Sequence, residues 1–266
     1  MQLRVFHAFW GMTGTLREKF ERAAKNGYVG IESPMPTLEE ESEFRELLDE
    51  FKLAYIPQVY TFGPDHIAKF TSVVERAITF RPVLINSQSA KDSMPDDDQD
   101  RFFEAALQVE KASGYIVAHE THRGRSMFTP WATARLLNAH PDLKITADFS
   151  HFMCVCESML DDQRDNLLLA ISRAVHIHGR IGHIEGPQVP HPAAPEYANE
   201  LATFEGWWAE IFAARRAAGV TFQTFTPEFG PPGYMPRLPF TRQALSDLFE
   251  VNHWIGERIK SKFVNM

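Results

Sequence analysis

The sequence predicts an α/β protein that folds as a single (β/α)8 TIM barrel. Short β-prone runs alternate with longer amphipathic segments from one end of the chain to the other, and eight such runs can be identified. Regular alternation of strand and helix implies parallel strands joined by right-handed crossovers. The length of 266 residues fits as well, because an α/β barrel of about 250 residues is a common single-domain fold. An open doubly wound sheet is the alternative, but no glycine-rich phosphate loop follows the first run.

The expected strands are short and follow one another along the whole chain. In order they are LRVFHAF (3–9), YVGIES (28–33), AYIPQVY (54–60), PVLINSQ (82–88), YIVAHET (115–121), LKITADF (143–149), AVHIHGR (174–180) and VTFQTFTPEF (220–229). No linker, low-complexity tract or block of charge divides them. We therefore expect one barrel domain over residues 1–266.

The segments between these runs carry apolar residues at spacings of three and four, as amphipathic helices do. Examples are LREKFERAAKNG (16–27), TLEEESEFRELLDEF (37–51), PDHIAKFTSVVERAITF (64–80) and QDRFFEAALQVEKASG (99–114). Gly27 and Gly114 stand where a helix C-cap is expected, just before the next strand. We interpret the acidic run DDDQD (96–100) as an exposed helix N-terminus, whose dipole favours acidic side chains, and not as a metal cluster.

The composition is that of an ordinary globular protein, with 44% hydrophobic and 23% charged residues. A formal net charge of -8 argues against a protein whose main partner is nucleic acid. No apolar run approaches the roughly 20 residues that span a bilayer, and MQLRVFHAFWGMTG lacks the pattern of a signal peptide. We expect a cytoplasmic protein without nucleic-acid or membrane partners, and whether it forms a homo-oligomer is left open.

The two cysteines, Cys154 and Cys156, are separated by one residue. This spacing is poor geometry for a disulfide and is not the CxxC spacing of a redox or zinc motif. We expect two free thiols near a helix start, with no assigned role.

Polar residues collect at the ends of the last four expected strands. The site of a TIM barrel lies at the C-terminal ends of its strands, so these residues should meet at one rim. They are Glu120, Asp148, His178 and Glu228. Side chains two residues apart on a strand point the same way, so His176 lies one layer deeper than His178 and is an alternative to it.

Three carboxylates that converge in one cleft repel one another and raise each other's pKa values unless a positive charge lies between them. A divalent cation is the simplest solution. Carboxylate oxygens with a single histidine suit Mn²⁺ or Mg²⁺, with Co²⁺ and Zn²⁺ as alternatives, whereas a structural zinc site more often contains cysteine. The expected cofactor is therefore one divalent metal ion, bound by the four residues at the strand ends.

The order of motifs along the chain resembles the xylose isomerase-like TIM barrels, which include sugar isomerases and epimerases, hydroxypyruvate isomerase and tagatose epimerase. The motifs are VGIE (29–32), INSQSAKD (85–92), AHETHRGR (118–125), ADFSH (147–151), HIHGR (176–180) and TPEFGPPGY (226–234). The resemblance covers nearly the whole chain. It implies the metal ligands Glu120, Asp148, His178 and Glu228, with His151 as a substrate contact.

The resemblance also implies a metal-dependent isomerase or epimerase of a sugar, a sugar phosphate or a related hydroxy-carbonyl compound. The substrate would chelate the metal, and Glu120 or Glu228 would remove a proton as general base. The cation would stabilise the resulting cis-enediolate. Return of the proton to the neighbouring carbon or oxygen gives isomerisation, whereas delivery by the second glutamate from the opposite face gives epimerisation.

Other polar residues follow the expected strands. Arg180 and His122 could bind an anionic or hydroxylated end of the substrate, while Arg123 and Arg125 lie in a loop that could equally be a solvated basic turn. The segment EGPQVPHPAAPEY (185–197) is either a semi-rigid wall over the site or an ordinary loop. Residues that could line the pocket or simply pack are Trp10, His7, Glu32, Gln58 and Asn86.

Three other functions compete with the isomerase or epimerase. A lyase acting on a hydroxy acid shares the metal and the base, so the sequence does not separate the two. A non-catalytic sugar-binding protein would not need two carboxylates placed to exchange protons. A DNA-repair endonuclease is the weakest alternative, because such relatives bind three metals with additional histidines on early strands, where this chain has Glu32 and Gln58.

Overall fold

The computed structural model describes residues 1–263, and its eight strands close into a barrel in which each strand pairs with its neighbour in chain order. The strands are β1 (Gln2–Ala8), β2 (Gly30–Pro34), β3 (Ala54–Tyr60), β4 (Ile85–Gln88), β5 (Val117–Glu120), β6 (Lys144–Ala147), β7 (Ala174–His178) and β8 (Phe222–Thr226). β1 pairs with β8 in parallel and closes the ring. The predicted (β/α)8 TIM barrel is confirmed, and each expected run overlaps one strand.

Several strands are shorter than the β-prone runs that predicted them. β4, β5 and β6 have 4 residues each. A parallel ladder extends only as far as both neighbouring strands run side by side, and the flanking residues continue into loops. The pairing of β6 with β7 is irregular between Ile145 and Thr146, just before the chain reaches Asp148. Such irregularities are common near active sites, because they change the direction of a side chain.

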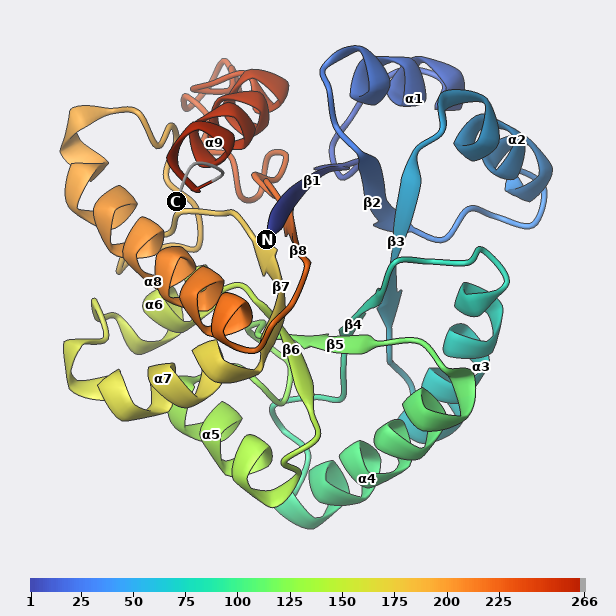
Figure 1. Ribbon diagram of the computed structural model, residues 1–266. Coiled ribbons are helices and arrows are strands. Elements are labelled where there is room, and N and C mark those ends of the chain that lie inside the picture. The colour runs from blue at the N-terminus through green and yellow to red at the C-terminus, as the bar shows by residue number, and fades with distance from the viewer. Residues whose placement is uncertain (264–266) are drawn as a thin grey trace.

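The helices lie outside the barrel and surround the strands (Figure 1). They are α1 (Leu16–Lys25), α2 (Glu41–Phe51), α3 (His66–Ile78), α4 (Asp96–Ser113), α5 (Pro130–Ala139), α6 (Ser150–Cys156), α7 (Arg164–Arg173), α8 (Ala198–Ala217) and α9 (Leu248–Phe263), with short 3-10 turns η1 (Asp161–Gln163) and η2 (Pro195–Tyr197). Within residues 1–263, no helix has the length and apolar character needed to cross a membrane. Cys154 and Cys156 lie in α6 as free thiols, as expected.

Local sequence signals set the helix ends. Thr15 and Glu18 form a capping box at the start of α1, where each side chain accepts a hydrogen bond from the backbone N–H of the other residue. Gly114 is the C-cap of α4 at a φ of 72°, as expected, whereas Asn26 is the C-cap of α1 and Gly27 follows it at a φ of 71°. α4 begins at Asp96, which confirms the acidic run as a helix N-terminus.

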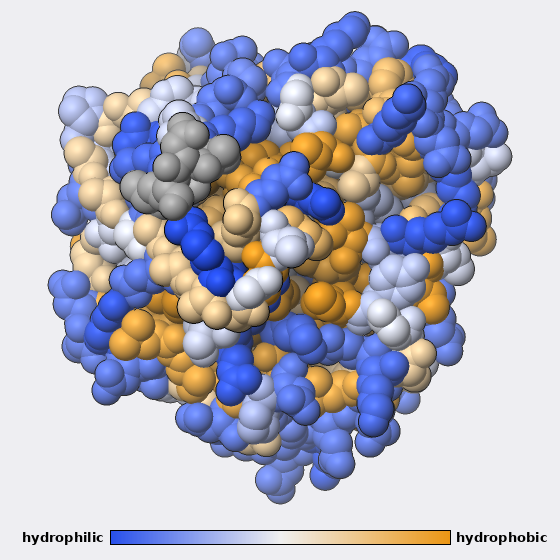
Figure 2. Space-filling view, viewed as in Figure 1, coloured by the Kyte–Doolittle hydropathy of each residue, from blue (hydrophilic) through white to orange (hydrophobic). Residues whose placement is uncertain are grey.

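The core between strands and helices is rich in aromatic side chains. Phe20 of α1 and Phe44 of α2 meet edge to face, with ring centroids 5.3 Å apart. Inside the barrel, Phe6, Ile56 and Ala118 belong to one buried apolar cluster. On the face of the molecule in Figure 2, hydrophilic side chains surround the rim and hydrophobic residues gather towards the middle. The barrel interior is therefore apolar at its N-terminal end, and polar residues begin one layer further along the strands.

Gly30 of β2 stands where the barrel has no room for a side chain. A Cβ atom at this position would lie 2.4 Å from the Ala54 carbonyl oxygen and 2.4 Å from the Phe6 ring. The carbonyl belongs to the backbone of β3, so it cannot move aside without disturbing the sheet. Glycine is required here by space, since its φ is not in the left-handed region.

We expect Gly30→Ala to lower the free energy of unfolding by about 1–3 kcal/mol, because the added methyl group overpacks the barrel. Urea denaturation followed by circular dichroism would measure the change. Gly206→Ala is the matched control: Gly206 is exposed inside α8 with no heavy atom within 4 Å of an added Cβ. This control should gain about 0.4–1 kcal/mol. A Gly30→Ala variant as stable as wild type would show that the close approach does not constrain the barrel.

Candidate functional site

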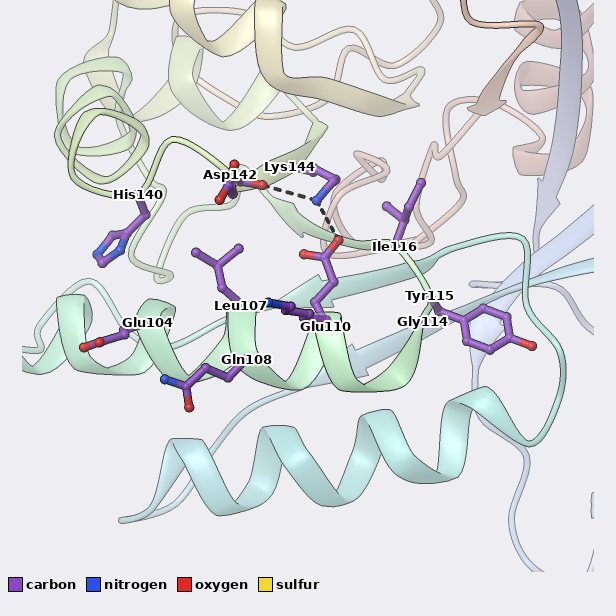
Figure 3. Close-up of a pocket in the computed structure, with 11 residues that line it drawn as sticks. Glu104, Leu107, Gln108, Glu110, Gly114, Tyr115, Ile116, His140, Asp142 and Lys144 are labelled. Carbon is purple, nitrogen blue, oxygen red and sulfur yellow. Dashed lines mark hydrogen bonds and ion pairs between the residues drawn. The ribbon is translucent and has the colours of Figure 1, made fainter.

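The molecule has a large surface groove that is not the candidate site. It has a volume of about 590 Å³ and lies beside the C-terminal half of α4, next to Tyr115, Ile116 and Lys144 (Figure 3). These residues precede or begin β5 and β6, so the groove lies at the N-terminal end of the barrel. The amine of Lys144 is already bound to Glu110 Oε1 at 2.7 Å. TIM barrels carry their active sites at the opposite end, where the strands finish.

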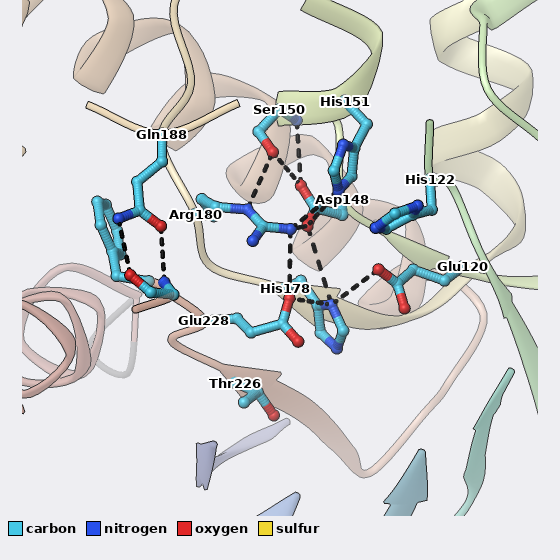
Figure 4. A network of polar contacts seen from close by, with 12 residues as sticks. Glu120, His122, Asp148, Ser150, His151, His178, Arg180, Gln188, Thr226 and Glu228 are labelled. Carbon is cyan, nitrogen blue, oxygen red and sulfur yellow. Dashed lines mark hydrogen bonds and ion pairs between the residues drawn. The ribbon is translucent and has the colours of Figure 1, made fainter. Parts of the chain in front are cut away.

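At that opposite end the structure brings together the four side chains that the sequence marks as metal ligands (Figure 4). Glu120 and His178 are the last residues of β5 and β7, Asp148 directly follows β6, and Glu228 lies shortly after β8. One ligand atom from each lies within 4.8 Å of the ligand atoms of the others, and all four residues are buried. Their binding of a metal stays a prediction.

The imidazole of His178 lies between two sets of carboxylates. Its Nδ1 is 2.9 Å from Glu228 Oε2, 3.7 Å from Glu120 Oε1 and 3.9 Å from Asp148 Oδ2. Its Nε2 is 2.9 Å from Glu32 Oε1 on the other side. When Nε2 carries the proton, its N–H group donates a hydrogen bond to Glu32. The lone pair of Nδ1 then faces the other three carboxylates. This is the tautomer that a metal ligand requires.

Two buried atoms that face this cluster have no hydrogen-bond partner among the described residues: Oε1 of Glu120 and Nδ1 of His178. A buried polar atom without a partner destabilises the fold and calls for an explanation. A cation placed between these atoms would satisfy both. Three carboxylates and one imidazole form a donor set that suits Mn²⁺ or Mg²⁺. The residues present therefore fit a single divalent ion.

Arg180 brings a positive charge to the same cluster. Its Nη2 contacts Asp148 Oδ2 and lies 3.4 Å from Glu228 Oε2, and the side chain is fully buried. Burial lowers the pKa of Arg180, but Asp148 and Glu228 outweigh it and raise the pKa above its ordinary value. One guanidinium does not offset all the carboxylates here, because Glu32 is buried beside His178 as well. The charge balance at the site still favours a further cation.

The pKa shifts agree with this balance. Burial raises the pKa of the Glu120 carboxyl, but the nearby charge of His178 and other polar neighbours bring it down to about 2. Burial lowers the pKa of His178, but Glu228, Glu32 and Glu120 outweigh it and hold the pKa well above its ordinary value. The Glu120 carboxylate is thus ionised at neutral pH and attracts positive charge. A metal ion would compete with a proton for His178, so its binding should release protons.

His176 lies one layer below His178, as strand parity predicts. Its Nε2 is 3.0 Å from Glu32 Oε2, and its Nδ1 is 2.8 Å from the Thr224 hydroxyl. It does not belong to the group of four, although it forms a second cluster with Glu32 and His178. The geometry therefore favours His178 as the histidine that faces the other candidate ligands.

Residues from the early strands orient the candidate ligands. Glu32 contacts both histidines, Asn86 Nδ2 donates to Glu120 Oε2 at 3.0 Å, and Gln58 Nε2 donates to Glu228 Oε1 at 2.9 Å. The sequence marked these three residues only as polar groups at strand ends, which either line the pocket or pack. Glu32 and Gln58 have partners on strands that are not their neighbours, and Asn86 has its partner on the adjacent strand β5, so no local pattern identifies these contacts.

A cavity of about 210 Å³ reaches the candidate ligands Glu120 and Glu228. The other residues that line it are Trp10, Pro34, Gln58, Tyr60, Gln88, His122, Arg180 and Tyr234. Pockets for drug-sized ligands usually span about 300–1,000 Å³, so this cavity suits a smaller molecule. Aromatic side chains and charged side chains both line it.

His122 and His151 lie together beside this cavity, with ring centroids 3.9 Å apart. His122 lines the cavity, whereas His151 is fully buried behind it, with Nε2 3.0 Å from Arg180 Nη2. Burial and the charges of His122 and Arg180 hold the pKa of His151 well below its ordinary value. The expected contact between His151 and substrate stays a prediction, because His151 is buried and is not among the residues that line the cavity.

The two loops considered from the sequence have different positions. Arg125 donates to the backbone carbonyl of Thr61 at 2.8 Å and so holds two loops together, while the Arg123 guanidinium lies 4.9 Å from the centre of the Tyr234 ring. In the 185–197 segment, Gln188 exchanges two hydrogen bonds with the backbone of Gly230. This segment is therefore fastened to the chain that follows β8.

No family model matches the chain, and no curated protein matches its sequence. Solved structures do match over nearly its whole length. A probable 3-DHS dehydratase from Bacillus anthracis is 17% identical with a TM-score of 0.62, over 99% of this chain and 100% of that chain. The 3-keto-D-glucoside 4-epimerase of E. coli is 14% identical with a TM-score of 0.60, over 98% and 100%. A D-tagatose 3-epimerase-like protein is 12% identical with a TM-score of 0.64, over 100% and 98%.

At these identities the likeness concerns the fold. The matching structures also include endonuclease IV from Thermus thermophilus and a fusion protein described as containing a xylose isomerase-like TIM barrel. The resemblance to xylose isomerase-like TIM barrels is therefore confirmed for the fold. Since epimerases, a dehydratase and an endonuclease share this fold, the fold alone does not select one activity.

We expect Glu32→Gln to weaken Mn²⁺ binding about 10–100-fold, because the amide no longer draws the Nε2 proton of His178. Isothermal titration calorimetry of the metal-free protein would measure the affinity, and wild type should bind one ion per chain. Glu110→Gln is the control, since Glu110 is also a buried glutamate but pairs with Lys144 at the other end of the barrel. Equal Mn²⁺ affinities for wild type and Glu32→Gln would contradict this role of Glu32.

Proposed function

We propose that the protein is a divalent-metal-dependent isomerase or epimerase of a sugar, a sugar phosphate or a related hydroxy-carbonyl compound. One observation carries this proposal: Glu120 and Glu228 belong to the four-residue cluster and also line the cavity. Two carboxylates that reach both a cation and a substrate can move protons on it. The fold shared with a 3-keto-D-glucoside 4-epimerase and a D-tagatose 3-epimerase-like protein supports the same choice.

In this proposal the cluster of Glu120, Asp148, His178 and Glu228 holds one divalent ion, with Mn²⁺ or Mg²⁺ ahead of Co²⁺ or Zn²⁺. A divalent ion in this place would act as a Lewis acid and make the C–H bond beside a carbonyl more acidic. The Glu32 carboxylate keeps the His178 ring in the orientation described above. All these groups are buried, so bulk water does not compete for them.

The two glutamates differ in how their oxygens are used. Oε2 of Glu120 accepts a hydrogen bond from Asn86, and Oε1 lies 3.7 Å from Nδ1 of His178, on the side where a cation would bind. Oε1 of Glu228 accepts from Gln58, and its Oε2 faces His178 and Arg180. In an isomerase one glutamate removes and returns the proton through a cis-enediolate. In an epimerase the second glutamate returns it to the opposite face.

The remaining lining residues would bind and enclose the substrate. Arg180 and His122 provide polar contacts at one side of the cavity, and Trp10, Tyr60 and Tyr234 provide apolar surface. Burial lowers the pKa of His122, so its ring is neutral and suits a hydroxyl group. We propose a small carbohydrate-like substrate, a cytoplasmic location and no nucleic-acid partner.

A lyase that acts on a hydroxy acid is the second candidate, and the fold shared with a probable 3-DHS dehydratase favours it. Elimination of water begins with the same removal of a proton beside a carbonyl, so Glu120 could serve both reactions. The products separate them, because a lyase releases water and forms a new double bond. A non-catalytic sugar-binding protein would show neither proton exchange nor product.

We expect Glu120→Gln to abolish exchange of a substrate C–H proton with D₂O, even when metal is present in excess. The amide keeps the shape and one acceptor oxygen but lacks the basicity to remove a proton. Proton NMR of candidate ketoses and hydroxy-carbonyl acids would follow exchange, with metal occupancy checked separately. Glu228→Gln is the companion variant. In an epimerase it should retain exchange with one epimer without inversion, whereas wild-type exchange in both variants would require a different base.

His151→Ala is expected to reduce turnover while one metal ion per chain remains bound. Its ring supports His122 and Arg180, which line the cavity, but it is not one of the four candidate ligands. Metal content measured by elemental analysis, together with steady-state kinetics, would test both halves of this expectation. Loss of stoichiometric metal from the variant would show that His151 belongs to the metal site instead.

A further inference from the structure

We infer that the substrate carries a carboxylate that binds to Arg180, so that the cavity takes a short hydroxy or oxo acid in preference to a neutral sugar. The inference rests on the proposed function, because it concerns the substrate of the same cavity. It starts from one nitrogen of the Arg180 guanidinium, which the protein leaves without a partner.

The Arg180 guanidinium uses two of its three nitrogens within the protein. Nε donates to the Ser150 hydroxyl at 3.2 Å, and Nη2 contacts Asp148 and lies 3.0 Å from His151 Nε2. Nη1 has no partner among the described residues, and the contacts drawn for this side chain in Figure 4 leave one terminal nitrogen free. Nη1 carries two N–H groups, so two hydrogen-bond donors are available.

Arg180 lies at the cavity as well as at the carboxylate cluster. The side chain is 1% exposed and lines the cavity together with Trp10 and Tyr234. The centres of the Trp10 and Tyr234 rings lie 5.7 Å and 4.8 Å from the guanidinium carbon, so both aromatic rings lie close to the positive charge of Arg180. A buried charged donor without an acceptor is costly, and a negatively charged acceptor forms the strongest hydrogen bond with it. An anionic group in the cavity would satisfy this donor.

The size and charge of the cavity favour a carboxylate over a phosphate. A volume of about 210 Å³ lies below the roughly 300–1,000 Å³ of pockets for drug-sized ligands, so the cavity suits a short molecule. The same cavity is lined by Glu120 and Glu228, which repel anions. A phosphate carries close to two negative charges and meets about twice the repulsion of a carboxylate. A carboxylate is also planar and matches the guanidinium.

His122 does not compete with Arg180 for this group. Its Nδ1 lies 2.5 Å from the Arg123 backbone carbonyl oxygen, so this nitrogen already has a partner within the protein. The Arg123 guanidinium lies over the Tyr234 ring, and Arg123 is not among the residues that line the cavity. The carboxylate therefore binds at the Arg180 side, and the carbonyl and hydroxyl of the substrate lie towards Glu120 and Glu228.

A matched pair of small molecules tests this inference by binding alone. Hydroxypyruvate and dihydroxyacetone share a carbonyl and a neighbouring hydroxyl, and differ in having a carboxylate or a hydroxymethyl group. Calorimetry on the Mn²⁺-loaded protein should show hydroxypyruvate binding about tenfold or more tightly than dihydroxyacetone. In Arg180→Met this ratio should fall to near one, and Arg180→Lys should retain part of it. Arg125→Met is the control, because that arginine binds backbone carbonyls and should leave the ratio unchanged.

Metal content is measured in each variant, since Arg180 also touches Asp148. Equal affinities in wild type, binding of neither compound, or a ratio that persists in metal-loaded Arg180→Met would each overturn the inference. Tighter binding of dihydroxyacetone phosphate than of hydroxypyruvate would assign the position to a phosphate instead. Selective binding of hydroxypyruvate without proton exchange on any substrate would leave this inference standing and refute the proposed function. Exchange on a neutral ketose without carboxylate preference would do the reverse.

Discussion

The burial of four carboxylates at one end of the barrel is the constraint on which the rest of the structure depends. They are Glu32, Glu120, Asp148 and Glu228. Removing an ionised carboxylate from water costs several kcal/mol unless charged and hydrogen-bonded partners surround it. Each of the four accordingly has such partners: His176 and His178 for Glu32, Arg180 for Asp148, and amide donors for the other two. Replacing one partner would leave a buried charge uncompensated.

The closed barrel makes this pairing possible. β2, β3 and β4 supply Glu32, Gln58 and Asn86, whereas the candidate ligands come from the ends of β5 to β8. Gln58 and Glu228 are 170 residues apart in sequence and meet at 2.9 Å. Because both sets of strands belong to one ring, each half neutralises and orients the polar groups of the other. An open sheet would hold the same residues along an edge, without partners on the facing side.

Burial also links the stability of the fold to the occupancy of the site. Oε1 of Glu120 and Nδ1 of His178 make no hydrogen bond among the described residues, although Nδ1 lies 2.9 Å from Glu228 Oε2, and a cation between them would bind both atoms. A ligand that binds only the folded chain stabilises it in proportion to the logarithm of its concentration above Kd. The same reasoning applies to Nη1 of Arg180 and a substrate anion. The atoms proposed to bind the metal ion and the substrate are thus among those for which the folded protein supplies no hydrogen bond.

The sequence by itself determined the barrel and the rim on which the polar residues gather. Strand and helix periodicity are local patterns, and so is a polar residue at the end of a β-prone run, as at Glu120 and Asp148. Tertiary structure decided the rest. It placed His178, and not His176, among the other three candidate ligands, gave Glu32 its two histidine partners, and left one nitrogen of Arg180 without a hydrogen bond. These features depend on which side chains meet across a closed ring, between positions more than a hundred residues apart, and no local pattern encodes such distances.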